Sequence, residues 1–148
     1  MKKKFDRQYS ALGLQAPANE MDPREKAEII FYAACKKKGI DPALRPAVHE
    51  LEGKYQAPLT GLYELMVIRD AITENREADW NDAGEEKWGG WFLMNKPGFR
   101  FGVSLCVIVY SFTAGGSRLC TFDEEDQEFF MNECVAFWAD FYGGKLPS

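Results

Sequence analysis

The residue with the clearest capacity for acid–base chemistry is His49, the only histidine in the chain, which is followed by Glu50 and Glu52. A histidine titrates near neutral pH and acts as a general base when a serine or cysteine nucleophile lies within hydrogen-bonding reach. The chain contains no G-x-S-x-G, H-E-x-x-H, P-loop or G-x-G-x-x-G motif to accompany it. An enzyme that uses His49 is therefore kept as an alternative, and a histidine on a polar surface is the favoured interpretation.

Acidic residues and cysteines are the candidate metal ligands. Residues 123–128 contain five carboxylates, the ligands that hard cations prefer. They lack the spacing of a calcium-binding loop, and acidic residues at the start of a helix are explained by the helix dipole. The four cysteines are far apart and form no C-x-x-C pair; they are Cys35, Cys106, Cys120 and Cys134. We therefore expect reduced cysteines in the core, no metal and no cofactor.

Three of the four tryptophans, Trp80, Trp88 and Trp91, fall within the segment 79–91, among turn-forming Asp, Asn and Gly residues. Exposed indoles can stack on bases, sugars or a peptide. The turn-forming residues favour a second interpretation, in which the indoles pin a long loop against a sheet. If the segment instead forms a binding surface, we expect Arg118 to belong to it.

Charge is unevenly distributed along the 148 residues, with a net charge of +2 over residues 1–76 and −7 over residues 77–148. A protein that binds phosphates usually carries a basic stripe, because neutralising phosphates supplies much of the affinity. Here the lysines cluster only at 2–4 and 36–38, which are typical of a solvated terminus and of the last turn of a helix. A nucleic-acid-binding accessory protein is therefore a second alternative, less favoured than a protein that binds another protein.

The helices and strands that position these residues are predicted from hydrophobic periodicity and from capping and turn residues. Residues 1–21 show no sustained period and are expected to be a flexible N-terminal arm, and 22–148 to be a single α+β domain. Asp22 and Pro23 form a helix-start signal and Gly39 a stop signal, so we predict a helix over 23–38, a second helix over 58–76 and a short or broken helix within 42–56. Strands are predicted over 88–94 and 100–112, separated by a turn signal at 95–98, and over 117–122. A helix is predicted over 123–142, closed by Gly143. The expected fold is N-terminal helices, a three-stranded antiparallel meander and a long C-terminal helix packed on the sheet.

The predicted central strand, 100–112, has apolar residues on both faces. One face would carry Val103 and Leu105, and the other would carry Cys106, Tyr110 and Phe112. A strand that is apolar on both sides needs two covers, and we favour the N-terminal helices as the second one. Without that cover, the exposed aromatic patch would mark a surface for a protein partner or for a homodimer.

The chain shows no sign of a membrane or secretory protein. Phe5 is followed by Asp6 and Arg7, so the basic start leads into no apolar run of the kind found in a signal peptide. The longest strongly apolar stretch, 103–112, is far shorter than the roughly 20 residues of a membrane-spanning helix. We expect a cytoplasmic protein that does not contact a membrane.

Several short motifs lie within residues 78–142: D-W-N at 79–81, K-W at 87–88 and S-R-L-C at 117–120, followed by an aromatic helix with an acidic start. The set resembles small uncharacterised proteins encoded by phages and mobile elements of gut bacteria. Glu77-Ala78 stands where that pattern has W-x-P, and Thr121 and Asp123 depart from its F-K-S end. The resemblance implies a mobile-element origin and brings no established activity or catalytic residue.

The leading hypothesis from the sequence is a non-enzymatic interaction or accessory protein of a phage or mobile element. It would bind a protein partner, or itself, through an aromatic sheet and a Trp-rich loop, because large aromatic side chains anchor interfaces. The candidate contact residues are Trp80, Trp88, Trp91, Tyr110, Phe112 and Arg118.

Overall fold

The computed structural model describes residues 3–106 and 117–147, which form five α-helices, one 3-10 helix and a two-stranded antiparallel sheet. The elements are α1 (Asp6–Ala11), α2 (Pro23–Lys38), α3 (Gly53–Thr73), β1 (Trp88–Leu93), β2 (Arg100–Cys106), η1 (Ser117–Leu119), α4 (Glu124–Glu133) and α5 (Val135–Tyr142). The predicted α+β class is confirmed.

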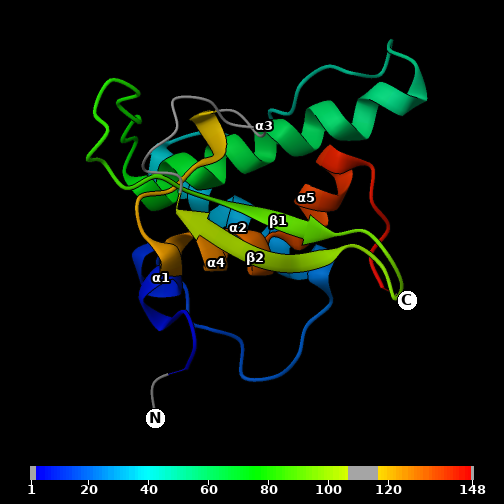
Figure 1. Cartoon of the computed structure of the whole chain (residues 1–148). Helices are drawn as coiled ribbons and strands as arrows, with labels where there is room; N and C mark the ends of the chain where they lie inside the picture. Colours follow the sequence, from blue (N-terminus) through cyan, green and yellow to red (C-terminus); the bar gives the residue numbers. More distant parts are fainter. Residues whose placement is uncertain (1–2, 107–116, 148) are drawn as a thin grey trace.

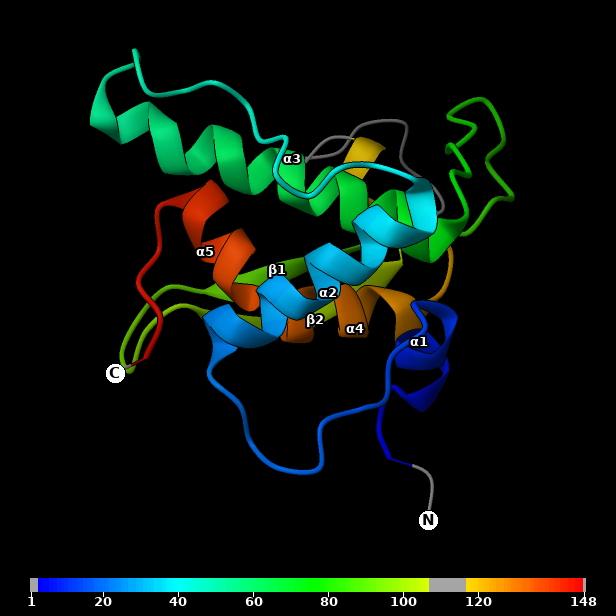
Figure 2. The ribbon, with the colours of Figure 1, turned by 180° about the vertical axis from the view of Figure 1, so that it is seen from behind.

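The sheet forms an outer layer against one side of the helices. In Figure 1 the hairpin of β1 and β2 lies in front of α2, α4 and α5, and in Figure 2, seen from behind, it lies beyond them. α4 packs against both strands, and α3 packs on α2 and α5. The core therefore lies between the helices and one face of the sheet.

The start and end of α2 are set by the residues that the sequence analysis singled out. The Asp22 carboxylate accepts hydrogen bonds from the backbone amides of Arg24 and Glu25 at 2.9 and 3.1 Å, and Pro23 occupies the first helical position. Gly39 ends the helix with a φ of 69°, a left-handed conformation that glycine adopts without strain. The predicted helix over 23–38 is confirmed.

The prediction of a flexible arm over residues 1–21 differs from what the structure shows. Residues 6–11 form α1, and Phe5, Tyr9 and Leu12 are buried in the core. The rings of Phe5 and Tyr9 both pack edge-on against Phe129 of α4, with ring centroids 5.7 and 5.2 Å apart. The Tyr9 hydroxyl also donates a hydrogen bond to the Glu133 carboxylate. The buried surface and this hydrogen bond attach the segment to α4.

The expected short or broken helix within 42–56 is wrong, because residues 41–52 form a loop and α3 already begins at Gly53. The loop is held by Arg45, whose guanidinium lies 2.9 Å from a carboxylate oxygen of Glu28 and 3.3 Å from one of Glu64. The same guanidinium lies 3.9 Å from the centroid of the Phe31 ring. Burial raises the pKa of Glu64 to about 7, although Arg45 opposes the shift.

The predicted third strand over 117–122 is also wrong. Residues 117–119 form the 3-10 helix η1, and only Thr121 pairs with the sheet, through an isolated bridge to Trp88. Leu119 and Cys120 are consecutive and both buried, so this segment turns into the core instead of alternating between two faces as a strand does. The rest of the predicted central strand, from residue 107 onward, lies outside the described residues.

The predicted long C-terminal helix is divided in two. α4 packs on the sheet as expected, but the helix is interrupted at Cys134, whose φ and ψ of −106° and 20° are not helical. Across the break, the Trp138 indole N–H donates a hydrogen bond to the backbone oxygen of Phe130 at 3.0 Å. The break lets α5 turn toward α3, where a Cβ at Gly61 would lie only 2.9 Å from the backbone oxygen of Phe137.

Candidate functional site

The two faces of the β1–β2 hairpin differ in what covers them. Gly90 pairs with Ser104 and faces α4, because a Cβ at Gly90 would lie 2.0 Å from the sulfur of Met131. The next pair, Trp91 with Val103, therefore points to the opposite face. There the two side chains lie side by side and remain 60% and 50% exposed.

A β-bulge in β2 keeps the same face of the hairpin covered, and the same face open, on both sides of the bulge. Trp91 pairs with Val103 and Phe92 pairs with Phe101, so Gly102 is the extra residue on β2. A Cβ at Gly102 would lie 2.8 Å from the backbone oxygen of Trp91, which explains the glycine. Beyond the bulge, Phe92 stacks on Phe99 in the core, with ring centroids 4.6 Å apart. The bulge thus preserves one covered and one open face.

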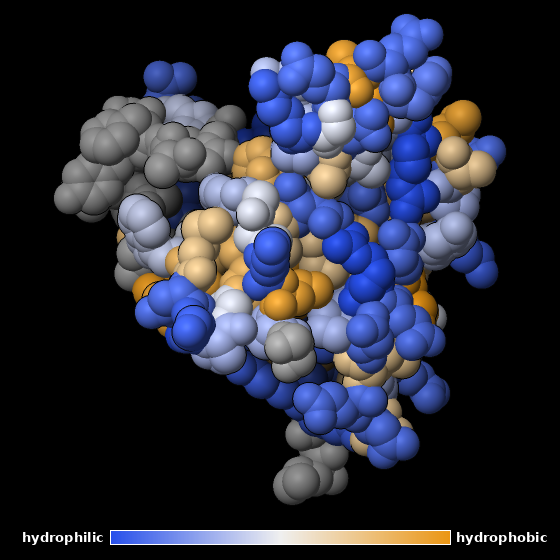
Figure 3. Space-filling view, turned by 90° about the vertical axis from the view of Figure 1, so that its right-hand side faces the viewer, coloured by the Kyte–Doolittle hydropathy of each residue, from blue (hydrophilic) through white to orange (hydrophobic). Residues whose placement is uncertain are grey.

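We call Trp91, Leu93 and Val103 the open face of the hairpin. Leu93 is exposed and follows the alternation from Trp91, and Met94 continues the exposed apolar surface into the turn at residues 95–98. Figure 3, which shows the side of the molecule where the hairpin turn lies, has hydrophobic side chains among mostly hydrophilic ones. Among the residues that the structure describes, no helix packs on the open face. Cover by the N-terminal helices, which the sequence analysis favoured, is therefore wrong for this part of the strand.

Trp80 belongs to a different environment, the loop of residues 79–87. At the centre of this loop, Lys87 is only 2% exposed. Its ammonium donates to the backbone oxygens of Asp82 and Glu85 at 3.0 and 3.4 Å and lies 3.3 Å from a carboxylate oxygen of Glu85. The Trp80 ring covers the same ammonium, with 5.3 Å from Nζ to the ring centroid. Trp80 is thus part of a closed loop.

The acidic residues of this loop are satisfied by the chain itself. Glu85 accepts hydrogen bonds from the Arg76 guanidinium at 2.7 Å and from the Asp79 amide at 2.9 Å. Burial opposes the shift, but these hydrogen bonds and Lys87 lower the pKa of Glu85. Asp79 and Asp82 cap backbone amides two residues further on, which is the predicted Asx-type turn. No group of metal-binding side chains occurs among residues 3–106 and 117–147.

The remaining predicted contact residues are distributed differently. Trp88 begins β1, is half-buried, and its indole N–H lies 3.4 Å from a carboxylate oxygen of Glu86. Arg118 is exposed in η1, and none of the described contacts joins it to the three tryptophans. Tyr110 and Phe112 lie outside the described residues. Of the predicted contact residues that the structure describes, Trp91 alone lies on the open face.

His49 lies in the loop of residues 41–52, where its side chain is 79% exposed and 4.0 Å from Glu50. The acidic residues 123–128 serve the start of α4. Asp123 caps the helix by accepting from the Asp126 amide at 2.8 Å, and Arg7 of α1 lies within 3.4 Å of three of these carboxylates. His49 is therefore an exposed loop residue, and the acidic residues cap α4 and pair with Arg7 of α1.

The predicted contact residues lack three members of the open-face region, Leu93, Met94 and Val103. The signal was present in the segment W-G-G-W-F-L at 88–93, where Trp91 and Leu93 alternate with the inward-facing Gly90 and Phe92. Such alternation predicts one covered and one open face. The helix that covers Gly90, α4, lies far along the chain. The sequence of the hairpin alone therefore could not predict which of its two faces is covered.

The fold and the surface together define an α+β protein whose small sheet is covered on one face and open on the other. No family model matches the chain, and no curated protein or solved structure shows significant similarity to it. Within the described residues, no helix is both long and apolar enough to cross a bilayer.

Proposed function

We propose that this chain is a non-enzymatic accessory protein that binds a protein partner through the open face of its hairpin. The observation that carries the proposal is the pair Trp91 and Val103, adjacent across the two strands and at least half exposed. Exposed apolar side chains scattered singly are common, but an aromatic and aliphatic pair held on a rigid sheet offers contact area at small entropic cost.

A protein partner suits this surface better than a nucleic acid. The nearest strand cation, Arg100, is engaged within the hairpin turn, where its guanidinium donates to the backbone oxygens of Asn95 and Gly98 at 3.0 and 2.9 Å. The net charge of residues 77–148 is −7, which repels phosphates. Binding that depends on apolar contact persists as salt rises, whereas phosphate binding weakens steeply.

The proposal includes a mobile-element origin and a cytoplasmic location. The origin rests on the D-W-N, K-W and S-R-L-C motifs of the sequence. The structure gives two of these residues a local role, since Asp79 makes a turn and Lys87 closes its loop. The location is supported by Cys35 and Cys134, which lie in the core as buried thiols.

Affinity capture with paired variants tests the proposal. The immobilised chain is compared with Trp91→Ser/Val103→Ser, and Tyr55→Ser, which replaces an exposed aromatic residue of α3, is the matched control. We expect the wild type and Tyr55→Ser to retain one and the same protein at low and high salt. The double variant should bind the purified form of that protein about 30-fold or more weakly, as expected for a central aromatic anchor. Equal binding by the double variant, or capture of nucleic acid that is lost at high salt, would contradict the proposal.

A further inference from the structure

A second exposed apolar surface lies on α2, on the side of this helix that faces away from the core. Ala27, Ile30, Phe31 and Ala34 point into the core, whereas Ile29 and Tyr32 are 40% and 53% exposed. Glu25 and Lys36 extend the same stripe at its two ends, so the four residues are spaced by four, three and four positions. This is the spacing at which side chains share one seam of a helix. We call Glu25, Ile29, Tyr32 and Lys36 the α2 seam.

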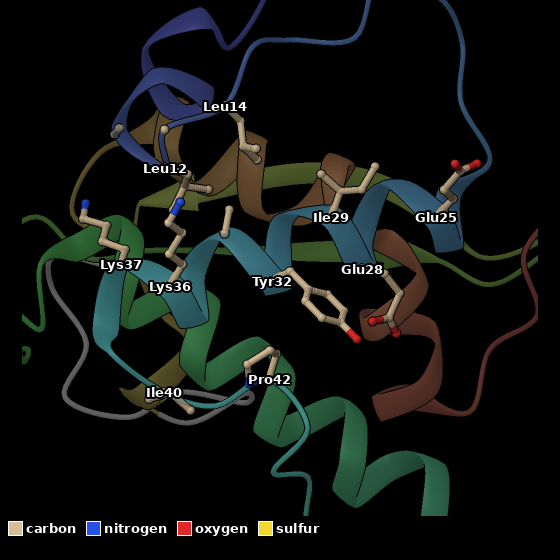
Figure 4. A pocket seen from close by; sticks show the side chains of 13 residues that line it. Leu12, Leu14, Glu25, Glu28, Ile29, Tyr32, Lys36, Lys37, Ile40 and Pro42 are labelled. Carbon is tan, nitrogen blue, oxygen red and sulfur yellow. The ribbon is translucent and has the colours of Figure 1, made fainter.

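The four residues of the α2 seam are among those that line an open groove of about 1260 Å³. Leu12 and Leu14, which follow α1, line one side, and Ile40 and Pro42 line the other. In Figure 4, the side chains of Lys36 and Lys37 lie at one end of the groove and those of Glu25 and Glu28 at the other, with Ile29 and Tyr32 between them. The groove thus has an apolar centre, a basic end and an acidic end.

Because the acidic and basic residues lie at opposite ends of the α2 seam, a second copy of the seam turned end to end places its acidic end opposite the basic end of the first. The spacing of four, three and four reads the same from either end, so a helix laid antiparallel on α2 meets the seam in register. If that helix is a second α2, Glu25 of each copy lies opposite Lys36 of the other, and Ile29 lies opposite Tyr32. A two-fold axis then generates both halves of the contact from one surface.

We propose that a second copy of this chain docks on the groove, with the two α2 helices antiparallel. Antiparallel helix dipoles attract, and opposite charges face each other at both ends of the contact. The side chains of Glu25 and Lys36 form no ion pair or hydrogen bond with any other described residue, so both are available to a second copy. By contrast, Glu28 already pairs with Arg45, and Lys37 already donates to the Ala71 backbone oxygen.

The dimer is independent of the open face described above. α2 lies behind the hairpin in Figure 1 and in front of it in Figure 2, so the two surfaces occupy opposite sides of the chain. A dimer through α2 therefore presents two open faces outward. Two linked binding faces raise the apparent affinity for a multivalent partner without any new contact.

Charge reversal tests the inference, with the molar mass measured by light scattering and sedimentation over a range of concentrations. The wild type should be dimeric. Glu25→Lys and Lys36→Glu should each weaken the dimer about tenfold or more, because each places like charges opposite one another. An equimolar mixture of the two variants should restore a dimer, because the charges at positions 25 and 36 of the two copies are then opposite again at both ends of the contact. Circular dichroism checks that each variant is folded.

Two controls separate this inference from the proposed function. Tyr32→Asp should abolish the dimer, whereas Trp91→Ser/Val103→Ser should leave it intact. A wild type that is monomeric at its highest soluble concentration would overturn the inference. So would charge-reversal variants that dimerise as well as the wild type, or a mixture that fails to regain the dimer. None of these results bears on whether the open face binds a protein partner.

Discussion

Trp80 and Trp91 lie in one short segment of the chain, yet the structure gives them opposite environments. Trp80 covers the ammonium of Lys87 in a closed loop, and Trp91 lies exposed beside Val103 on the open face. The two rings differ in what they contact. The Trp80 ring lies over the buried ammonium of Lys87, whereas among the described residues no helix packs over Trp91 on its face of the hairpin. Indole content alone therefore does not identify a binding surface.

The loop of residues 41–52 shows that closure by a cation is not confined to the Trp-rich segment. Arg45 takes the position that Lys87 takes in the other loop, with two carboxylates and an aromatic ring as its partners. Both loops are held by a cation and an aromatic face, and neither relies on a regular hydrogen-bonded element. The open face has no such closure among the described residues. The following predictions test this contrast.

The largest effect is expected from Lys87→Met. The substitution keeps the length of the side chain but leaves the Asp82 and Glu85 oxygens in the loop without their donor. Breaking a buried ion pair by removing one partner costs about 3 kcal/mol. Urea unfolding should therefore show a free energy of unfolding lower by about that amount. A loss below about 1 kcal/mol would mean that the loop is not closed by this lysine.

A second effect is expected from pH, through Glu64 in the Arg45 network. The pKa of Glu64 is about 7 in the folded chain, against an ordinary value of 4.5. Between these values the folded state keeps a proton that the unfolded state has lost, so the free energy of unfolding should fall as pH rises from 4.5 to 7. This contribution is fully present below pH 4.5 and is lost above pH 7.

Glu64→Gln should flatten this part of the stability profile, because glutamine does not titrate. Glu50→Gln is the matched control, since Glu50 is exposed in the same loop as His49. The measurement is urea unfolding at a series of pH values. A wild-type profile that rises across this range, or a Glu64→Gln variant with an unchanged slope, would contradict the assigned role.

The smallest effects compare the two tryptophans directly. Trp80→Ala should lower the free energy of unfolding by about 1 to 2 kcal/mol, because it uncovers Lys87, and Trp91→Ala should lower it by less than about 1 kcal/mol. In a Lys87→Met background, the cost of Trp80→Ala should decrease by about 0.5 to 1 kcal/mol, whereas the cost of Trp91→Ala should not change. If Trp91→Ala and Trp80→Ala lowered the free energy of unfolding equally, the two tryptophans would not differ in their contribution to stability.

Local signals in the sequence predicted much of the fold. The cap and proline at Asp22 and Pro23 fixed the start of α2, and the turn signal at 95–98 separated β1 from β2. Gly143 ends α5 with a φ of 74°, as its position after the aromatic helix predicted. These features depend on neighbouring residues, so local chemistry is enough to specify them.

The wrong predictions concern features that depend on distant contacts. The spacing of Phe130, Cys134, Phe137 and Phe141 continues unbroken through the interruption at Cys134, so periodicity gives no sign of the break between α4 and α5. The N-terminal segment has a short apolar stripe at Phe5, Tyr9 and Leu12, but only its contact with α4 makes a helix of six residues stable. Which face of the hairpin is covered also depends on contact with α4, so the sequence of the hairpin alone could not predict it.

Hydroxyl-radical footprinting read by mass spectrometry measures whether the free protein exposes the open face of its hairpin. The chain contains internal references, since Trp138 and Met131 are buried in the core. We expect Trp91 and Met94 to be oxidised rapidly while Trp138 and Met131 are protected. Protection of Trp91 and Met94 equal to that of Trp138 and Met131 would show that this face of the hairpin is already covered in the free protein.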